Sequence, residues 1–335
     1  MAALLKKVPE LTLLILLTIV GYALMGIFSN VTGTEVLSPG GVWMVVAGSF
    51  LFSTFIAVVA VVAGIGGGVL FTPVVMAFTS MDTLIVRATG LVVAMFSGLI
   101  STGPFMRSGL SSIKITFYAS VPIVVGAISG SFAAIHMAAV MGPEGDAIVR
   151  LLLGLILVFI AMMFILGGSK TEFPVPRKID AFSQKIGLGG AYFEESLQKR
   201  VDYQLTRSIP GLILFLLVGF TGGFFGLGGG WAVVPVLNLV MAAPLKVSAA
   251  CSGVLLALGN ASAIWPYIMY GALIPVFVAP WMVGQVIGGL MGAYILAKIK
   301  VGIVRKILIV ILILTSLKLI SRGVETLTGI DIPVF

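Results

Sequence analysis

Apolar residues fill long stretches of the chain, and polar residues interrupt them at only a few points. Stretches of about 20 apolar residues, the length needed to cross roughly 30 Å of hydrocarbon, recur from Leu11 to Val334 with few charges inside them. Because they do not alternate strictly between apolar and polar positions, they predict helices and not the strands of a barrel. The pattern indicates an all-α integral membrane protein.

Composition and charge agree with a membrane location. Of 335 residues, 59% are hydrophobic and 10% are charged, which is far from the balance of a soluble domain. The net charge is +8, but the Lys and Arg residues lie in short segments beside apolar spans, as topology signals and headgroup contacts do. We expect a multi-pass protein of the cell (plasma) membrane that contacts the lipid bilayer and binds no nucleic acid.

The N-terminal segment has features of both a signal peptide and a membrane helix. Lys6 and Lys7 precede an apolar core, as in a signal peptide, but no clear cleavage site follows and further spans do. We therefore expect residues 1–40 to form an uncleaved transmembrane helix and a loop, with the N-terminus in the cytoplasm.

The chain contains two related halves. A displacement of 162 residues aligns residues 63–131 with the second half without a gap, and nine Gly or Pro residues coincide. The most distinctive match pairs "GIGGG" at 64–68 with "GLGGG" at 226–230, each followed by a proline. We expect repeat 1 over 41–168 and repeat 2 over 208–323. A polar, cytoplasmic linker over 169–207 joins them, and a tail over 324–335 follows.

Loop charges indicate that the repeats have opposite orientations. Lys and Arg in short loops mark the cytoplasmic side. Arg107 and Lys114 lie in one loop of repeat 1, whereas the corresponding loop 269–275 of repeat 2 is uncharged. The next pair of loops reverses this pattern, because 141–146 carries only acidic charges and 297–306 carries four basic residues. Inverted-topology repeats require an odd number of crossings in each half.

Three clear crossings are predicted in each repeat. They cover 84–106, 115–138 and 147–168, and then 247–268, 275–297 and 303–321. Each glycine run is left between an apolar arm, 42–63 or 209–225, and a short arm, 69–79 or 231–242. Eleven helical residues rise only about 16 Å, so each glycine run is predicted to be the tip of a re-entrant, Gly-broken helical hairpin.

Two opposed glycine tips are suited to binding an anion. Irregular backbone at membrane depth is tolerated only where it is buried in protein or lines a watery cavity, and matching broken helices in inverted repeats mark transporter sites. A helix N-terminus favours an anion, and glycine lets it approach closely. The candidate ligands are Gly66, Gly67, Gly68, Gly228, Gly229 and Gly230, with Pro73 and Pro235 in a structural role.

Helix packing is the alternative explanation for glycines in a membrane protein, because small residues let helices approach. We favour packing for four glycines, namely Gly126, Gly130, Gly288 and Gly292. Packing alone does not explain why a proline follows both tips at the same distance. We therefore favour a binding role for the tips.

The paired motifs resemble a known family. "GIGGGVLFTP" and "GLGGGWAVVP", followed by "RATGLVVAMFSG" and "SAACSGVLLALGN", are similar to the TauE/SafE-type sulfite exporter family, also called the toluene sulfonate uptake permease group. The resemblance covers nearly the whole chain after the first helix. It implies transport of a small sulfur-containing anion such as sulfite or an organosulfonate, and it leaves the particular anion and the direction open.

Polar side chains that follow the tips are candidates to complete the site. They are Thr89, Ser97, Cys251, Ser252 and Asn260. Asn260 and Gln285 are amides in apolar helices, where an unsatisfied polar group is costly, so each either bonds another helix or contacts substrate. Arg87 lies near a predicted helix start, and a headgroup role is favoured over attraction of an anion.

These features favour a secondary transporter over an enzyme. No predicted crossing has a central Asp or Glu, and an exported anion gains about 2.3 kcal/mol per charge per 100 mV in an inside-negative cell. We expect an exporter or uniporter with no cofactor and no metal. An anion channel, an importer of a related anion and an accessory membrane subunit without transport activity are the alternatives, and a homo-oligomer stays open. An enzyme would need a nucleophile with a base or a metal cluster.

Overall fold

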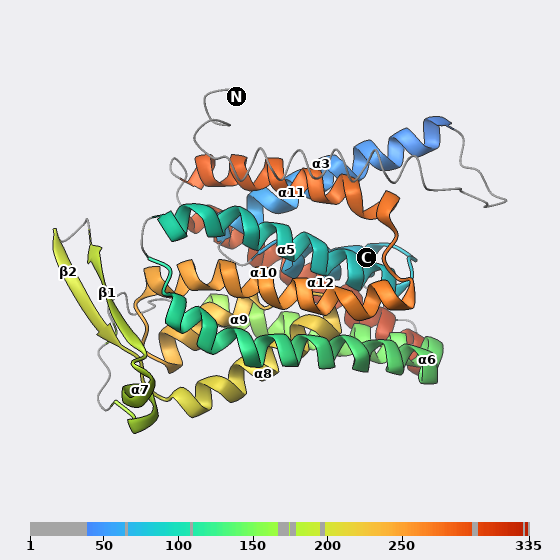
Figure 1. The fold of residues 1–335 in the computed structure, drawn as a ribbon. Helices are drawn as coiled ribbons and strands as arrows, with labels where there is room; N and C mark the ends of the chain where they lie inside the picture. The colour runs from blue at the N-terminus through green and yellow to red at the C-terminus, as the bar shows by residue number, and fades with distance from the viewer. Residues whose placement is uncertain are drawn as a thin grey trace.

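The computed structural model describes residues 39–63, 66–107, 110–166, 174, 179–194, 198–296, 301–330 and 332–333. The expected first transmembrane helix lies almost entirely outside these residues. The described chain is a bundle of long helices that run roughly side by side, with a small two-stranded sheet at one end of the bundle (Figure 1). Five of the helices are long and apolar enough to cross a membrane.

Within its described residues, the first half contains four helices. They are α3 (Pro39–Ala63), α4 (Gly68–Phe78), α5 (Thr83–Arg107) and α6 (Ile113–Leu166). Helix α6 bends sharply at Gly142, whose φ is +52°, a backbone conformation that glycine adopts at little cost. The bend divides α6 into two limbs, which correspond to the crossings predicted at 115–138 and 147–168.

The second half repeats this order of elements. It contains α8 (Ser208–Phe225), α9 (Gly230–Pro235), the π-helix η1 (Val236–Val240), α10 (Leu245–Tyr270), α11 (Pro275–Leu296) and α12 (Val301–Thr328). Helices α4, α5 and α6 begin at residues 68, 83 and 113, and α9, α10 and α11 begin at 230, 245 and 275. The first residues of corresponding helices are thus separated by the same 162 residues that align the two halves of the sequence.

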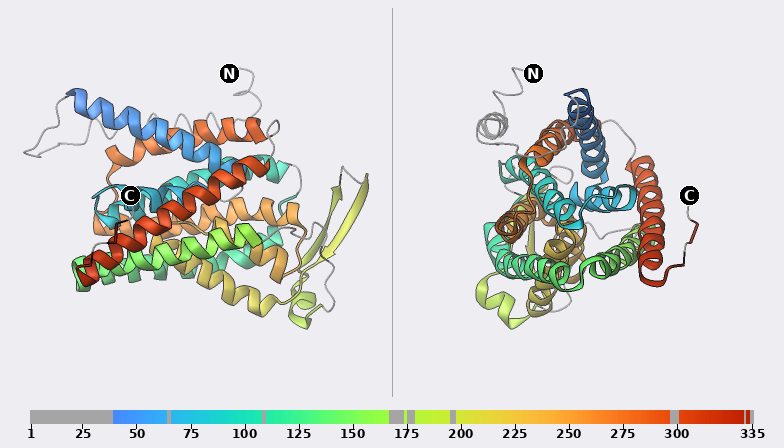
Figure 2. Two further views of the ribbon diagram at one scale, coloured as in Figure 1. Left: turned by 180° about the vertical axis from the view of Figure 1, so that it is seen from behind. Right: turned by 90° about the vertical axis from the view of Figure 1, so that its right-hand side faces the viewer.

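The bundle has two distinct ends. At the bend end, Asp82, Gly142, Asp146 and Tyr270 line one cavity. At the sheet end, Thr206 N donates to Met241 O at 3.0 Å, so α8 begins where η1 finishes, and this pair of arms enters and leaves at the sheet end. Helix α3 begins at the bend end, where α4 finishes (Figures 1 and 2). Helix α3 therefore begins at one end of the bundle and α8 at the other.

The segment predicted as a polar linker has more structure than expected. It forms α7 (Ala181–Ile186) and an antiparallel hairpin of β1 (Gly189–Glu194) and β2 (Lys199–Gln204). This sheet departs from the all-α prediction. Lys246 Nζ, at the start of α10, contacts the buried Glu194 at 2.5 Å. The hairpin is therefore tied to the sheet end of the bundle.

Asp180 ties the linker to repeat 2. Its carboxylate accepts a hydrogen bond from Ser183 N at the start of α7 and another from Ser208 Oγ at the start of α8. Although burial works to raise it, these hydrogen bonds lower the pKa of Asp180 overall. These hydrogen bonds therefore fix the linker in space relative to the first residue of α8.

Most of the helix contacts join one half to the other. Helix α3 packs on α11, α5 on α10, and α6 on both α8 and α12. A Cβ at Gly126 would lie 2.1 Å from Leu216 O, and one at Gly288 would lie 2.3 Å from Thr54 O. Only glycine permits backbones this close, so the packing role predicted for these two residues is confirmed.

Candidate functional site

The two glycine runs meet inside the bundle. A Cβ at Gly68, the first residue of α4, would lie 2.6 Å from Leu227 O of the opposing run. Thr72 Oγ1 donates to Gly226 O at 2.7 Å, and a Cβ at Gly90 on α5 would lie 2.5 Å from the same carbonyl oxygen. The contact between the halves at this point requires backbone without side chains. We call residues 66–68 the first tip and residues 226–230 the second tip.

The first tip is held by polar side chains from two other helices. Gly64, the first glycine of this run, lies outside the described residues. Gly66 has a φ of +79°, and Gly67 N donates to Ser97 Oγ on α5 at 3.2 Å. The side chain of Gln285 on α11 occupies the space beside Gly67, because a Cβ there would lie 2.4 Å from Gln285 Oε1.

Gln285 also connects this tip to α3. Its Nε2 donates to Ser53 O at 3.3 Å and contacts Ser53 Oγ at 3.2 Å. The hydrogen bonding between helices that the sequence predicts for Gln285 is therefore confirmed. Its Oε1 is buried and has no hydrogen-bond partner among the described residues.

The second tip has a different polar neighbour. Gly226 and Gly228 both have a φ of +69°, in the left-handed region that favours glycine. A Cβ at Gly228 would lie 3.0 Å from Nδ2 of Asn260 on α10. Asn260 is 3% exposed, and in the part of the chain that the structure describes its Nδ2 has no acceptor. A buried donor without a partner is costly, and this one lies against flexible glycine backbone.

A small cavity lies beside this amide. Its volume is about 10 Å³, and its lining includes Gly222, Gly229, Leu256, Gly259 and Asn260. That is room for about one water molecule. In this conformation the helices are therefore closed around the second tip, and a larger guest requires them to separate.

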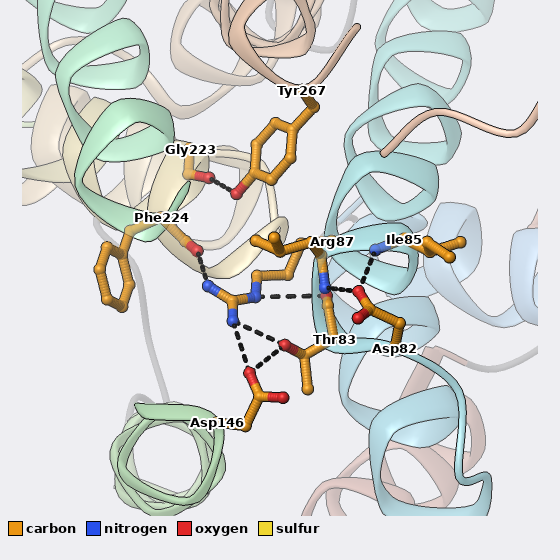
Figure 3. A network of polar contacts seen from close by, with 9 residues as sticks. Asp82, Thr83, Ile85, Arg87, Asp146, Gly223, Phe224 and Tyr267 are labelled. Carbon is orange, nitrogen blue, oxygen red and sulfur yellow. Dashed lines mark hydrogen bonds and ion pairs between the residues drawn. The ribbon is translucent and has the colours of Figure 1, made fainter. Parts of the chain in front are cut away.

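A buried ionic network holds the second tip from the bend end (Figure 3). Arg87 is 1% exposed; its Nη2 donates to Thr83 Oγ1 at 2.8 Å and lies 3.5 Å from Asp146 Oδ1. Arg87 Nη1 donates to Phe224 O at 3.4 Å, near the end of α8. The headgroup role predicted for Arg87 is therefore wrong, because the guanidinium points inward and binds carboxylate and carbonyl groups.

Tyr267 on α10 contributes a further bond to the same helix end. Its hydroxyl donates to Gly223 O at 2.9 Å, next to the carbonyl bound by Arg87. Carbonyls in the last turn of a helix receive no hydrogen bond from the backbone of that helix. Arg87 and Tyr267 therefore bind carbonyls at the end of α8, just before the second tip.

The structure brings Ser97 and Asn260 to the tips, and it gives the other predicted side chains different partners. Thr89 Oγ1 donates to Ile85 O at 2.8 Å, and Ser252 Oγ donates to Ala249 O at 2.8 Å, both on their own helices. Cys251 Sγ lies 3.9 Å from Ser112 O at the sheet end. A role of any of these residues in binding stays a prediction.

Asp146 is a charged residue of this region that sequence reasoning did not single out. It lies in a segment predicted as a loop between two crossings, and its ion pair joins α6 to α5. The available signal was Arg87 itself, because a charge inside an apolar span needs a partner. The sequence does not show which acidic residue folds against it.

Comparisons with known proteins agree on a transporter family. The sequence model of the family described as sulfite exporter TauE/SafE matches residues 49–319. The chain is also similar to the probable membrane transporter protein YunE of Bacillus subtilis (strain 168), with 24% identity over 268 residues, 78% of this chain and 92% of that protein. No solved structure matches the chain.

Proposed function

The chain belongs to the sulfite exporter TauE/SafE family, and we propose that it is a secondary transporter that carries a small sulfur-containing anion, such as sulfite or an organosulfonate, through the membrane. The likeness to YunE, whose name describes a probable membrane transporter, supports a transport role. The bound anion lies at the second tip in this proposal. The glycine backbone approaches it there without intervening side chains.

The observation that carries this proposal is the unpartnered amide of Asn260. Its Nδ2 is a buried donor beside Gly228, and an oxyanion is a pure acceptor. A bound anion would therefore satisfy this buried donor, which has no acceptor among the described residues. Because the adjoining cavity holds only about 10 Å³, binding requires the halves to rock apart, as in transporters built from repeats.

We also propose inverted repeats with the sheet end in the cytoplasm. The start of α3 at the bend end and the start of α8 at the sheet end support this arrangement (Figure 2). Lys114, Lys185 and Lys246 lie at the sheet end, whereas Asp82 and Glu144 lie at the bend end; basic residues favour the cytoplasmic side. The N-terminus is then cytoplasmic, with one crossing before α3.

Export is the direction that needs no coupling ion. An anion that leaves an inside-negative cell gains about 2.3 kcal/mol per charge per 100 mV. We therefore propose export or uniport driven by the membrane potential and the concentration gradient.

Counterflow in proteoliposomes tests the proposal. Vesicles loaded with sulfite should accumulate radiolabelled sulfite from outside, and the rate should saturate. Asn260→Asp keeps the size of the side chain and replaces the donor by a carboxylate, so we expect at least a tenfold loss. Ser262→Ala is the matched control on the same helix, since Ser262 Oγ bonds Leu258 O, and it should transport normally. Transport by Asn260→Asp at the wild-type rate would exclude this amide from the site, and absence of counterflow for sulfite and sulfonates would exclude the carrier.

A further inference from the structure

A second, larger cavity lies at the bend end of the bundle. Its volume is about 500 Å³, and its lining includes Asp82, Thr83, Ala138, Asp146, Arg150 and Tyr270. It is separate from the small cavity at the second tip, with which it shares no lining residue. We call it the bend cavity. It has room for a small hydrated anion, which the cavity beside Asn260 does not have in this conformation.

The charges around the bend cavity are unevenly matched. Arg150 lines the cavity, and within the described chain its buried Nε has no hydrogen-bond partner. Arg150 interacts electrostatically with Asp146, Arg87 and Arg322. Asp146 is already shared with Arg87 Nη2 at 3.5 Å and with Thr83 Oγ1. Asp146 therefore interacts with both Arg87 and Arg150, and the guanidinium of Arg322 adds further positive charge beside Arg150.

The other carboxylate of the cavity is engaged elsewhere. Asp82 Oδ1 accepts from Leu84 N at 2.8 Å and from Ile85 N at 3.2 Å, so it caps the first turn of α5 (Figure 3). An N-cap carboxylate is stabilised by these amides and is not free to neutralise Arg150. Among the residues that the structure describes, the Nε–H of Arg150 thus has no acceptor; it is a buried, charged donor on a side chain that lines the cavity.

We propose that the bend cavity is a second anion site, in which Arg150 binds a small oxyanion that competes with Asp146 for the guanidinium groups around it. A planar guanidinium binds an oxyanion through paired N–H donors. The oxyanion and Asp146 carry like charges, so occupancy of the cavity weakens the pair between Asp146 and Arg87.

This competition connects the cavity to the second tip. Arg87 Nη1 binds Phe224 O at 3.4 Å, and the backbone of Arg87 lies against Gly226, where a Cβ would be 2.5 Å from Arg87 Cα. Loss of Asp146 as a partner therefore alters the surroundings of the Arg87 guanidinium, which is the group that binds the end of α8. This coupling to transport rests on the proposed function, whereas binding of an oxyanion in the cavity does not.

A reporter in the cavity tests the site directly. Thr326 lines the bend cavity and is exposed, whereas Cys251 is fully buried and stays unlabelled. The full-length Thr326→Cys variant, labelled with bimane, is titrated with sulfate and then with sulfite at constant ionic strength kept with potassium chloride. We expect a saturable change in bimane emission for both ions.

Substitutions assign the signal to the proposed residues. Arg150→Gln should weaken the apparent affinity at least tenfold, and Arg150→Lys should give an intermediate value. Asp146→Asn should strengthen it several-fold, because the competing carboxylate is removed. Arg200→Gln is the charge-matched control at the sheet end, where Arg200 pairs with the exposed Asp202, and it should titrate as the parent does. Thermal unfolding of each variant confirms that the protein is folded.

The outcomes separate this inference from the proposed function. A flat titration in the parent, an unchanged affinity in Arg150→Gln or a weaker affinity in Asp146→Asn would each overturn the bend-cavity site. Asn260→Asp should keep the bimane titration while transport is lost. If wild-type vesicles carry no anion and the titration persists, the carrier proposal fails and the bend-cavity site stands.

Discussion

The two glycine tips occupy equivalent positions in the two halves, yet their surroundings differ. At the first tip, a backbone amide has an acceptor, because Gly67 N donates to Ser97 Oγ, and Gln285 fills the adjacent space. At the second tip, polar groups of neighbouring helices bind carbonyls, and Asn260 is left with a buried donor that has no described acceptor.

This difference follows from substitutions at corresponding positions of the repeats. Ser97 corresponds to Gly259 after the displacement of 162 residues, and Gly98 corresponds to Asn260. The hydroxyl that satisfies the first tip is therefore replaced at the second by glycine and a small cavity, with an amide one residue later. The backbones of the two tips are similar, and the side chains give the first tip an acceptor and leave the second with an unpartnered donor among the described residues. A binding role of Gly66, Gly67 and Gly68 stays a prediction.

The largest expected effect is on folding of the second tip. Gly226→Ala places a Cβ at a φ of +69°, within 2.5 Å of Arg87 Cα. Gly66→Ala meets nothing closer than 3.7 Å at a φ of +79°. We expect Gly226→Ala to lower the free energy of unfolding by more than about 4 kcal/mol, and Gly66→Ala by about 1–2 kcal/mol. Thermal or denaturant unfolding in detergent measures both, and equal losses would contradict the asymmetry.

The second-largest effect is expected for Gly229→Ala, which should reduce transport with a smaller loss of stability than Gly226→Ala. Gly229→Ala adds a methyl group beside the cavity, 3.0 Å from Val218 Cγ1 and 3.4 Å from Val233 Cγ2. We expect a loss of about 1–3 kcal/mol in stability from this overpacking and at least a tenfold loss of sulfite counterflow. Gly289→Ala, which meets only Ile100 at 3.1 Å, is the control. Counterflow in Gly229→Ala equal to that in Gly289→Ala would exclude the second tip.

A smaller effect is expected at the first tip. Ser97→Ala removes the acceptor of Gly67 N, and an unsatisfied buried group costs about 1–3 kcal/mol. Because the structure gives this hydroxyl a structural partner, we expect lower stability and a counterflow rate reduced less than threefold. A tenfold loss of counterflow with unchanged stability would instead place Ser97 among the groups that bind the anion.

The smallest effects are expected at Thr89 and Ser252. Both hydroxyls donate to carbonyls of their own helices. A helix does not need such side-chain bonds to form. Thr89→Val and Ser252→Ala should each change stability by no more than about 1 kcal/mol and leave the counterflow rate within twofold of wild type. A larger loss of transport would show that these hydroxyls turn toward the anion in another conformation.

Much of the helical architecture could be predicted from the sequence, because apolar length and glycine positions determine it. The arms predicted at 69–79 and 231–242 correspond to α4 and to α9 with η1. The hairpin over 189–204 was not predicted, since two short polar strands carry little signal. The predicted orientation of the Arg87 side chain was also wrong, because a position near a helix start does not show whether the side chain turns outward or inward.

The candidate site was predicted in part for a similar reason. A polar amide inside an apolar helix identified Asn260, but only the fold shows that its described neighbours provide no acceptor for Nδ2. Gln285 has the same sequence signal, yet the structure gives it Ser53 as a partner. Two residues with equal signals thus have different surroundings, and the difference depends on which helix packs opposite each one.

The most direct test of the central claim is a crystal structure with selenite in place of sulfite, since selenium gives an anomalous signal that locates the anion. We predict an anomalous peak within hydrogen-bond distance of Asn260 Nδ2, against the backbone of residues 228–230. A peak confined to any other position, in crystals of protein that is active in counterflow, would contradict the assignment of the second tip as the binding site.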